Sequence, residues 1–254
     1  MSGLLLRLAA PLQSWGEHSA FGERDTCRFP TRSGLIGMFA AAEGRRRTES
    51  LDDYTELEIT VRIDRPGVPL VDFHTVGGGY PPHLTVPTAE GKRRTAGAGT
   101  IVSRRHYLAD AAFTVAVTAP PQAQAVLERV GRALAQPVWP PYLGRRSCPP
   151  DTPFMLGTDV TDPIGDLRSV VPLACSRPWE KDSVDIDFVT EQFDVDGGAR
   201  TELNDVPASF APKNRRYRAR QVAVETITMP SDLCAGRGVD YLDRVAKYLA
   251  GAVA

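Results

Sequence analysis

The segment Arg28-Phe-Pro-Thr-Arg-Ser-Gly34 combines residue types that bind anions with a pattern that starts a helix. Thr31 and Ser33 carry hydroxyls, and Gly34 leaves the first helical N–H groups uncovered. The positive end of a helix dipole favours an anion, and Arg28 and Arg32 flank this end, so a phosphate group is the simplest partner. A helix cap beside surface arginines explains the segment equally well.

The loop Tyr142-Leu-Gly-Arg-Arg146 offers the groups that proteins use to hold single-stranded RNA. Tyr142 provides a ring that can stack on a base, and Gly144 frees the backbone. Arg145 and Arg146 can neutralise phosphates. We expect this loop to lie near the segment that begins at Arg28 and to hold the same stretch of RNA.

Acid–base and metal chemistry are weakly represented. His74 and His106 are the only credible acid–base candidates, and for each a structural or hydrogen-bonding role is favoured. The chain has no P-loop, no dinucleotide fingerprint and no metal-ligand spacing. We therefore expect no cofactor and no metal.

The charge is unevenly distributed along the chain. The net charge is −1, but residues 180–205 hold nine Asp or Glu and two Lys or Arg, which leaves a net of +6 elsewhere. Five basic clusters beside loops favour a polyanionic ligand, although single clusters are usually solvated. These clusters are residues 45–47, 92–94, 104–105, 145–146 and the run 213–220.

Composition sets the broad class of protein. The chain has 254 residues, 42% of them hydrophobic, which is ordinary for a chain that buries a core. No apolar run is long enough to span a bilayer, and residues 1–10 read as a strand, not a signal peptide. Four widely spaced cysteines favour reduced thiols. We expect a cytoplasmic protein with no membrane partner.

The hydrophobic periodicity predicts an α+β fold. Alternation predicts strands over 3–9, 57–63, 70–76 and 113–117, with a short strand at 154–156. Helical spacing predicts helices over about 34–43, with Ser33 as N-cap, and over about 121–135. This order fits a ferredoxin-like domain over residues 1–157.

Two regions fall outside that unit. Residues 77–103 are too rich in glycine and proline for an ordinary connection, so they predict a functional projection or a disordered loop. Residues 158–254 predict a C-terminal extension packed on the first domain, with an acidic start, a basic strand near 214–228 and a terminal amphipathic helix.

The sequence resembles the CasD family of type I-E CRISPR Cascade subunits, which belongs to the repeat-associated mysterious protein (RAMP) superfamily. The matching pieces follow the order and spacing of the family. They are residues 4–16, 28–37, 72–76, 106–115 and 141–149. The last hundred residues resemble the family only loosely, and 180–205 has no recognisable counterpart.

The resemblance implies a RAMP ferredoxin-like (RRM-like) domain whose insertion 77–103 forms a thumb. It implies binding of the 5′ handle of CRISPR RNA, contacts with the Cascade backbone subunit and large subunit, and indirect contact with target DNA. The RNA-binding residues that it implies match twelve positions here: Arg28, Thr31, Arg32, Ser33, Gly34, His74, Arg105, His106, Tyr142, Gly144, Arg145 and Arg146.

Three functions remain compatible with these residues. The first is a non-catalytic RNA-binding subunit. The second is a metal-independent endoribonuclease with His106 as general base, beside Arg105 and Tyr107. The third is an assembly factor whose basic clusters meet acidic proteins.

Overall fold

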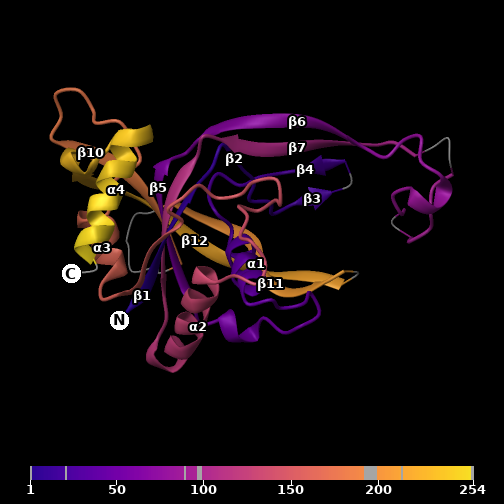
Figure 1. Cartoon of the computed structure of the whole chain (residues 1–254), viewed down its shortest axis with the longest axis horizontal. Helices are drawn as coiled ribbons and strands as arrows, with labels where there is room; N and C mark the ends of the chain where they lie inside the picture. The colour runs from indigo at the N-terminus through magenta and orange to yellow at the C-terminus, as the bar shows by residue number, and fades with distance from the viewer. Residues whose placement is uncertain are drawn as a thin grey trace.

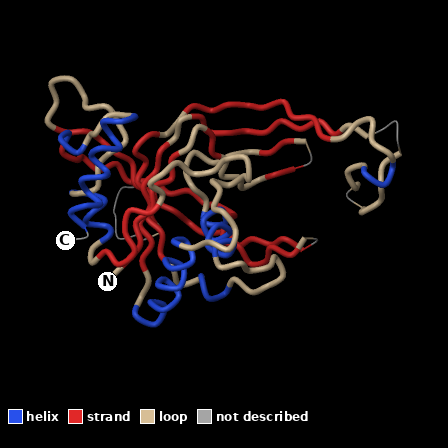
Figure 2. Tube along the Cα trace, viewed as in Figure 1, coloured by secondary structure: helices blue, strands red, loops and turns tan. Residues whose placement is uncertain are grey.

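The computed structural model describes residues 2–20, 22–88, 90–95, 99–191, 199–212 and 214–252 (Figures 1 and 2). The helices are α1 (Arg32–Ala42), α2 (Gln124–Ala135), α3 (Pro163–Ser169) and α4 (Gly238–Ala252). The strands are β1 (Gly3–Ala9), β2 (Leu12–Gln13), β3 (Ser19–Ala20), β4 (Glu23–Arg24), β5 (Glu58–Arg65), β6 (Val68–Val76), β7 (Ile101–Ala109), β8 (Ala112–Thr118), β9 (Met155–Val160), β10 (Ser183–Thr190), β11 (Ala199–Ala211) and β12 (Asn214–Pro230).

A seven-stranded antiparallel sheet forms the centre of the protein. Its strand order is β11-β12-β10-β5-β8-β1-β9. Strand β1 is buried along its whole length because both faces of the sheet are covered. Leu4, Leu6 and Leu8 pack with α1 and α2, whereas Leu5 and Ala9 pack on the face that α3 and α4 cover.

The predicted α+β class is confirmed, and the main elements lie close to their predicted positions. The apolar stripe of α1 is buried as expected, and so is that of α2 at Leu127, Val130 and Leu134. The basic strand and the terminal helix of the C-terminal third are β12 and α4. In the described residues, no helix is long and apolar enough to cross a membrane.

Strands β6 and β7 form an antiparallel ribbon that projects from the body, and we call this ribbon with its tip, residues 68–109, the arm (Figure 1). The predicted insertion 77–103 covers the tip and the first three residues of β7. Residues 89 and 96–98 of the tip lie outside the described residues. Because β6 pairs with β7 over its full length, the projecting segment begins earlier than the sequence predicts, at Val68.

The C-terminal third continues the central sheet. Strand β10 pairs with β5 and β12, and β9 crosses the predicted boundary at residue 157 while it pairs with β1. Arg62 on β5 is fully buried and donates to the carbonyls of Leu167 and Val171 at 2.5 and 2.9 Å. These bonds hold α3 against the sheet. Residues 192–198 of the acidic stretch lie outside the described residues.

Candidate nucleic-acid interface

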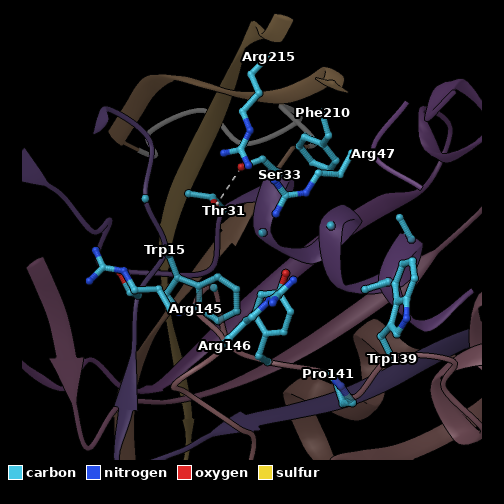
Figure 3. A pocket seen from close by; sticks show the side chains of 18 of the residues that line it. Trp15, Thr31, Ser33, Arg47, Trp139, Pro141, Arg145, Arg146, Phe210 and Arg215 are labelled. Carbon is cyan, nitrogen blue, oxygen red and sulfur yellow. Dashed lines mark hydrogen bonds between the residues drawn. The ribbon is translucent and has the colours of Figure 1, made fainter. Parts of the chain in front are cut away.

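A groove of about 1180 Å³ runs between α1, the loop that contains Tyr142 and the hairpin of β11 and β12 (Figure 3). Of the described residues, seven arginines and three carboxylates line it, so its walls carry excess positive charge. The arginines are Arg24, Arg45, Arg46, Arg47, Arg145, Arg146 and Arg215.

Three of the five basic clusters meet in this groove. Residues 45–47 follow α1, residues 145–146 follow α2, and Arg215 lies at the start of β12. The other two clusters, 92–94 and 104–105, lie on the arm. The sequence alone could not show that the first three clusters share a face, because their proximity depends on how the sheet brings α1, the loop and the hairpin together.

The loop at Tyr142 lies beside the start of α1, as predicted. Thr31, Ser33 and Gly34 line the same groove as Tyr142, Gly144, Arg145 and Arg146. Figure 3 shows Thr31 and Ser33 between Arg215 on one side and Arg145 and Arg146 on the other. The groove therefore presents hydroxyls, a ring and guanidinium groups to one space.

The loop is held in this place by its backbone. Ser14 donates its N–H to the Leu143 carbonyl at 3.2 Å, and Leu143 is fully buried. Gly144 has φ +81°, and a Cβ there would come within 1.6 Å of the Ser14 carbonyl oxygen. Gly144 thus permits a close backbone contact that positions its neighbours.

Arg145 and Arg146 differ in their surroundings. The Arg145 guanidinium lies 4.5 Å from the centre of the Tyr107 ring, and its Nη2 donates to the Arg24 carbonyl at 3.0 Å. Arg146 is exposed. Arg145 therefore both stabilises the wall of the groove and adds to its positive charge, whereas the guanidinium of Arg146 faces solvent.

Residues 45–47 also divide into two kinds. Arg45 bonds to Glu43 at 2.8 Å and to Asp53, and its guanidinium lies over the Tyr54 ring. Hydrogen bonding to Asp53 is the largest reason that the pKa of Arg45 is raised. Arg46 and Arg47 are exposed. The charge that this cluster offers to a ligand therefore comes from Arg46 and Arg47.

The start of α1 differs from the prediction. Its N-cap is Thr31, not Ser33, and the cap makes no side-chain hydrogen bond. The N–H of Arg32 instead donates to a carboxylate oxygen of Asp205 at 2.6 Å, and Asp205 is fully buried. The anion that the helix dipole favours is supplied by this protein's own β11.

Arg32, for which the sequence predicts phosphate binding, is paired within the protein in this structure. Arg32 is 3% exposed, and its Nη1 bonds to Glu191 at 2.8 and 2.9 Å. Its Nη2 donates to the carbonyls of Tyr54 and Thr55, both at 3.0 Å. Arg220 completes the cluster by bonding to both carboxylates. We call Arg32, Glu191, Asp205 and Arg220 the buried ion cluster.

Gly34 also has a packing role. A Cβ at Gly34 would come within 2.8 Å of the Trp15 ring. Trp15 is fully buried, and its Nε1 donates to the Gln13 side chain at 3.0 Å. Gly34 therefore lets α1 approach the indole that forms the floor of the groove.

Besides Arg32, four predicted site residues lie outside the groove. Arg28 is exposed, and His74, Arg105 and His106 lie on the arm. His74 is paired with Asp72 at 3.2 Å and His106 with Glu23 at 3.3 Å. The register places His74 opposite Ser103 and His106 opposite Val71, so the two imidazoles lie on opposite faces of the ribbon.

The sequence analysis did not predict the aromatic residues Trp139, Phe210 and Tyr217, which also line the groove. Trp139 is 46% exposed and Tyr217 is 39% exposed, and both line the groove. Phe210 packs 6.4 Å from Tyr217, ring centre to ring centre. The signal was present, because Tyr217 stands inside the basic run 213–220 and Trp139 lies three residues before Tyr142.

Residues 3–223 match the family described as CRISPR-associated protein (Cas_Cas5). A protein of Escherichia coli (strain K12), "CRISPR system Cascade subunit CasD", is 40% identical over 184 residues. That alignment covers 68% of this chain and 78% of the relative.

Solved structures agree with the sequence matches. A chain of a "CRISPR RNA-guided surveillance complex" has a TM-score of 0.86 and 53% identity, covering 98% of this chain and 99% of that chain. A "Crystal structure of Cas protein" has a TM-score of 0.62 and 30% identity, with 93% and 98% covered. The chain therefore belongs to the Cas5 family of CRISPR-associated proteins.

Proposed function

We propose that this chain is a non-catalytic RNA-binding subunit of a type I-E Cascade surveillance complex in antiviral defence, and that its groove holds the 5′ handle of the CRISPR RNA. The observation that carries the proposal is the convergence of three basic clusters with Tyr142, Trp139 and Tyr217 on one groove. The names of the relatives, a Cascade subunit and an RNA-guided complex, support it.

The groove would hold a single strand by two kinds of contact. Arg46, Arg47, Arg146 and Arg215 would neutralise phosphates, because their positions on three walls let them follow a backbone that bends. Tyr142 would stack on a base, since it borders the same space. Ser33 would donate its hydroxyl, and Thr31, which is 1% exposed and lies 3.4 Å from the Ser33 hydroxyl, would support it.

The RAMP ferredoxin-like assignment is part of this proposal. The element order β1-α1-β5-β8-α2-β9 follows the succession β-α-β-β-α-β, with the arm inserted between β5 and β8. The division at residue 157 into this unit and a C-terminal extension stays a prediction.

The arm is the proposed contact with the backbone and large subunits. Val71, Phe73 and Val102 alternate along one face of the ribbon and are 54%, 66% and 47% exposed. Apolar side chains in such a row favour a protein partner. Contact with target DNA would be indirect, through the assembled complex in the cytoplasm.

The experiment measures affinity for the 5′-handle RNA across a salt series. The double variant Arg47→Gln with Arg146→Gln removes two exposed groove arginines. If each neutralises one phosphate, the slope of log K against log salt should flatten by about 1.4 in total for a single strand. The double variant Arg132→Gln with Arg177→Gln is the matched control, because both arginines are exposed and outside the groove.

The outcomes separate RNA binding from general charge. A flattened slope in the groove variant alone supports the proposal. Equal flattening in both variants would indicate diffuse attraction, and an unchanged slope in the groove variant would contradict RNA binding at these arginines. All variants are first compared by circular dichroism and thermal unfolding.

The endoribonuclease remains the second candidate because His106 is oriented by Glu23, as a general base would be. Its three expected members do not share a face, since Arg105 and Tyr107 point away from the His106 side of the ribbon. We expect that the purified protein does not cleave repeat RNA when the two are incubated with a metal chelator. Cleavage that His106→Ala abolishes would establish the nuclease instead.

A further inference from the structure

A second pocket, of about 410 Å³, lies on the side of the sheet that α4 covers. The end of β1, the end of β5, the turn after β7 and the start of α4 line it. The charged or hydroxyl-bearing residues of its lining are Arg7, Arg65, Asp110, Asp151, Thr152, Arg237 and Tyr241. Within the described residues, the pocket and the groove share no lining residue.

Arg7 is a buried cation with incomplete partners. It is 7% exposed, and among the described residues it forms no ion pair. Its Nη1 reaches two backbone carbonyls at 3.3 and 3.5 Å, at the long end for hydrogen bonds, and its buried Nε has no partner. A buried charge in this state costs free energy that an anionic partner would recover.

Tyr241 supplies a second unpaired donor. It is 3% exposed, and its hydroxyl is buried without a hydrogen-bond partner. The Arg7 guanidinium lies 5.2 Å from the centre of its ring, so the ring stabilises the face of the cation and leaves the in-plane N–H groups available. Burial raises the pKa of Tyr241 to about 12, so the hydroxyl keeps its proton near neutral pH.

The described lining of the pocket holds three arginines and two aspartates, Asp110 and Asp151, so its formal charge is positive by one. Arg65 and Arg237 share one carboxylate, that of Asp110, at 2.8 and 3.1 Å. Helix α4 begins at Gly238 and runs for 15 residues, so its first N–H groups and the positive end of its dipole border the same space.

We propose that this pocket binds a small oxyanion, either phosphate or a carboxylate, through Arg7, the Tyr241 hydroxyl, Arg237 and the start of α4. The ligand would accept from Arg237 and the first N–H groups of α4, and from Arg7 Nε and the Tyr241 hydroxyl once these two buried groups turn toward the pocket. The ligand would also neutralise the positive charge of Arg65 and Arg237 that Asp110 balances only in part. Because no groove residue takes part, the site stands independently of RNA binding.

The test uses the full-length, RNA-free protein in a buffer without phosphate or carboxylate. Sodium phosphate and sodium acetate are titrated separately by calorimetry, and thermal unfolding is recorded at matched ionic strength in sodium chloride. We expect saturable binding of at least one oxyanion and a higher Tm than in chloride. Tighter binding of phosphate or of acetate identifies the source of the oxyanion.

Two variants leave the core packed. Tyr241→Phe removes only the hydroxyl, and Arg237→Gln changes a side chain that is 61% exposed. Each should weaken binding roughly tenfold, as expected for a hydrogen bond to a charged group. The double variant Arg132→Gln with Arg177→Gln changes two exposed arginines that line neither pocket and should bind as the wild type does. Absence of saturable binding, or wild-type affinity in both pocket variants, would overturn the proposal.

Discussion

The buried ion cluster and the groove lie on either side of the first turn of α1, and both are built from arginines. In the cluster, Arg32 and Arg220 meet Glu191 and Asp205 at 2.6 to 2.9 Å, and Asp205 is fully buried. In the groove, Arg46, Arg47, Arg146 and Arg215 are exposed to solvent. Arg215 and Arg220 lie on the same strand, β12, but Arg220 stabilises the fold whereas Arg215 offers its charge to a ligand.

The difference depends on the carboxylates of the C-terminal third. Part of the acidic stretch 180–205 folds back to neutralise the start of α1, while the β11–β12 hairpin that carries Asp205 also brings Arg215 and Tyr217 to the groove. The hairpin therefore does two things: it provides the helix with its anion, and it forms a wall of the proposed RNA site. Changes in either region test whether the two functions are separable.

A substitution in the buried ion cluster should change stability more than any change in the groove. Asp205→Ala should lower the free energy of unfolding by about 3–5 kcal/mol, because it leaves the largely covered Arg220 without two of its bonds and the buried Arg32 N–H without its acceptor. Urea unfolding measures the change. Glu202→Ala, an exposed position on the same strand, is the matched control and should stay within about 0.5 kcal/mol of wild type. A similar loss in both variants would show that the cluster contributes no special stability.

The next effect belongs to the groove. Tyr142→Ala should weaken handle-RNA binding by about 5- to 150-fold, because stacking of one base contributes about 1–3 kcal/mol. Fluorescence anisotropy at fixed salt measures it. Tyr80→Ala on the tip of the arm, an exposed tyrosine outside the groove, should bind RNA as the wild type does. Unchanged affinity in Tyr142→Ala would mean that its ring only packs in the wall.

The smallest effect separates two neighbouring arginines. Arg146→Ala should reduce the salt slope by about 0.7 and leave the thermal stability unchanged. Arg145→Ala should also lower the free energy of unfolding, by about 1 kcal/mol, because it loses the Tyr107 ring and the Arg24 carbonyl. Thermal and urea unfolding of the two variants give the comparison. Equal stabilities would place Arg145 with the ligand-facing set.

Local pattern was sufficient for the main secondary structure. Strand β1, strand β8 and helix α2 lie close to their predicted positions because alternation and helical spacing record which side chains face a core. The projection of the arm was indicated by the glycine and proline content of 77–103, but its length was underestimated. Nothing in the local sequence of β6 shows that this strand leaves the body at Val68, because its pairing with β7 is not visible in the sequence.

The residue types that can hold RNA were readable from the sequence, which also singled out the loop at Tyr142 and the start of α1. The structure brings these two segments together in one groove. Which of these groups remain available to a ligand depends on how the chain folds. The N-cap is Thr31 and not Ser33, and Arg32 is buried outside the groove. The partners of Arg32, Glu191 and Asp205, stand 159 and 173 residues away in sequence. An arginine's charge is visible in the sequence, but the carboxylate that neutralises it is selected by how strands far apart in the chain pair in the sheet.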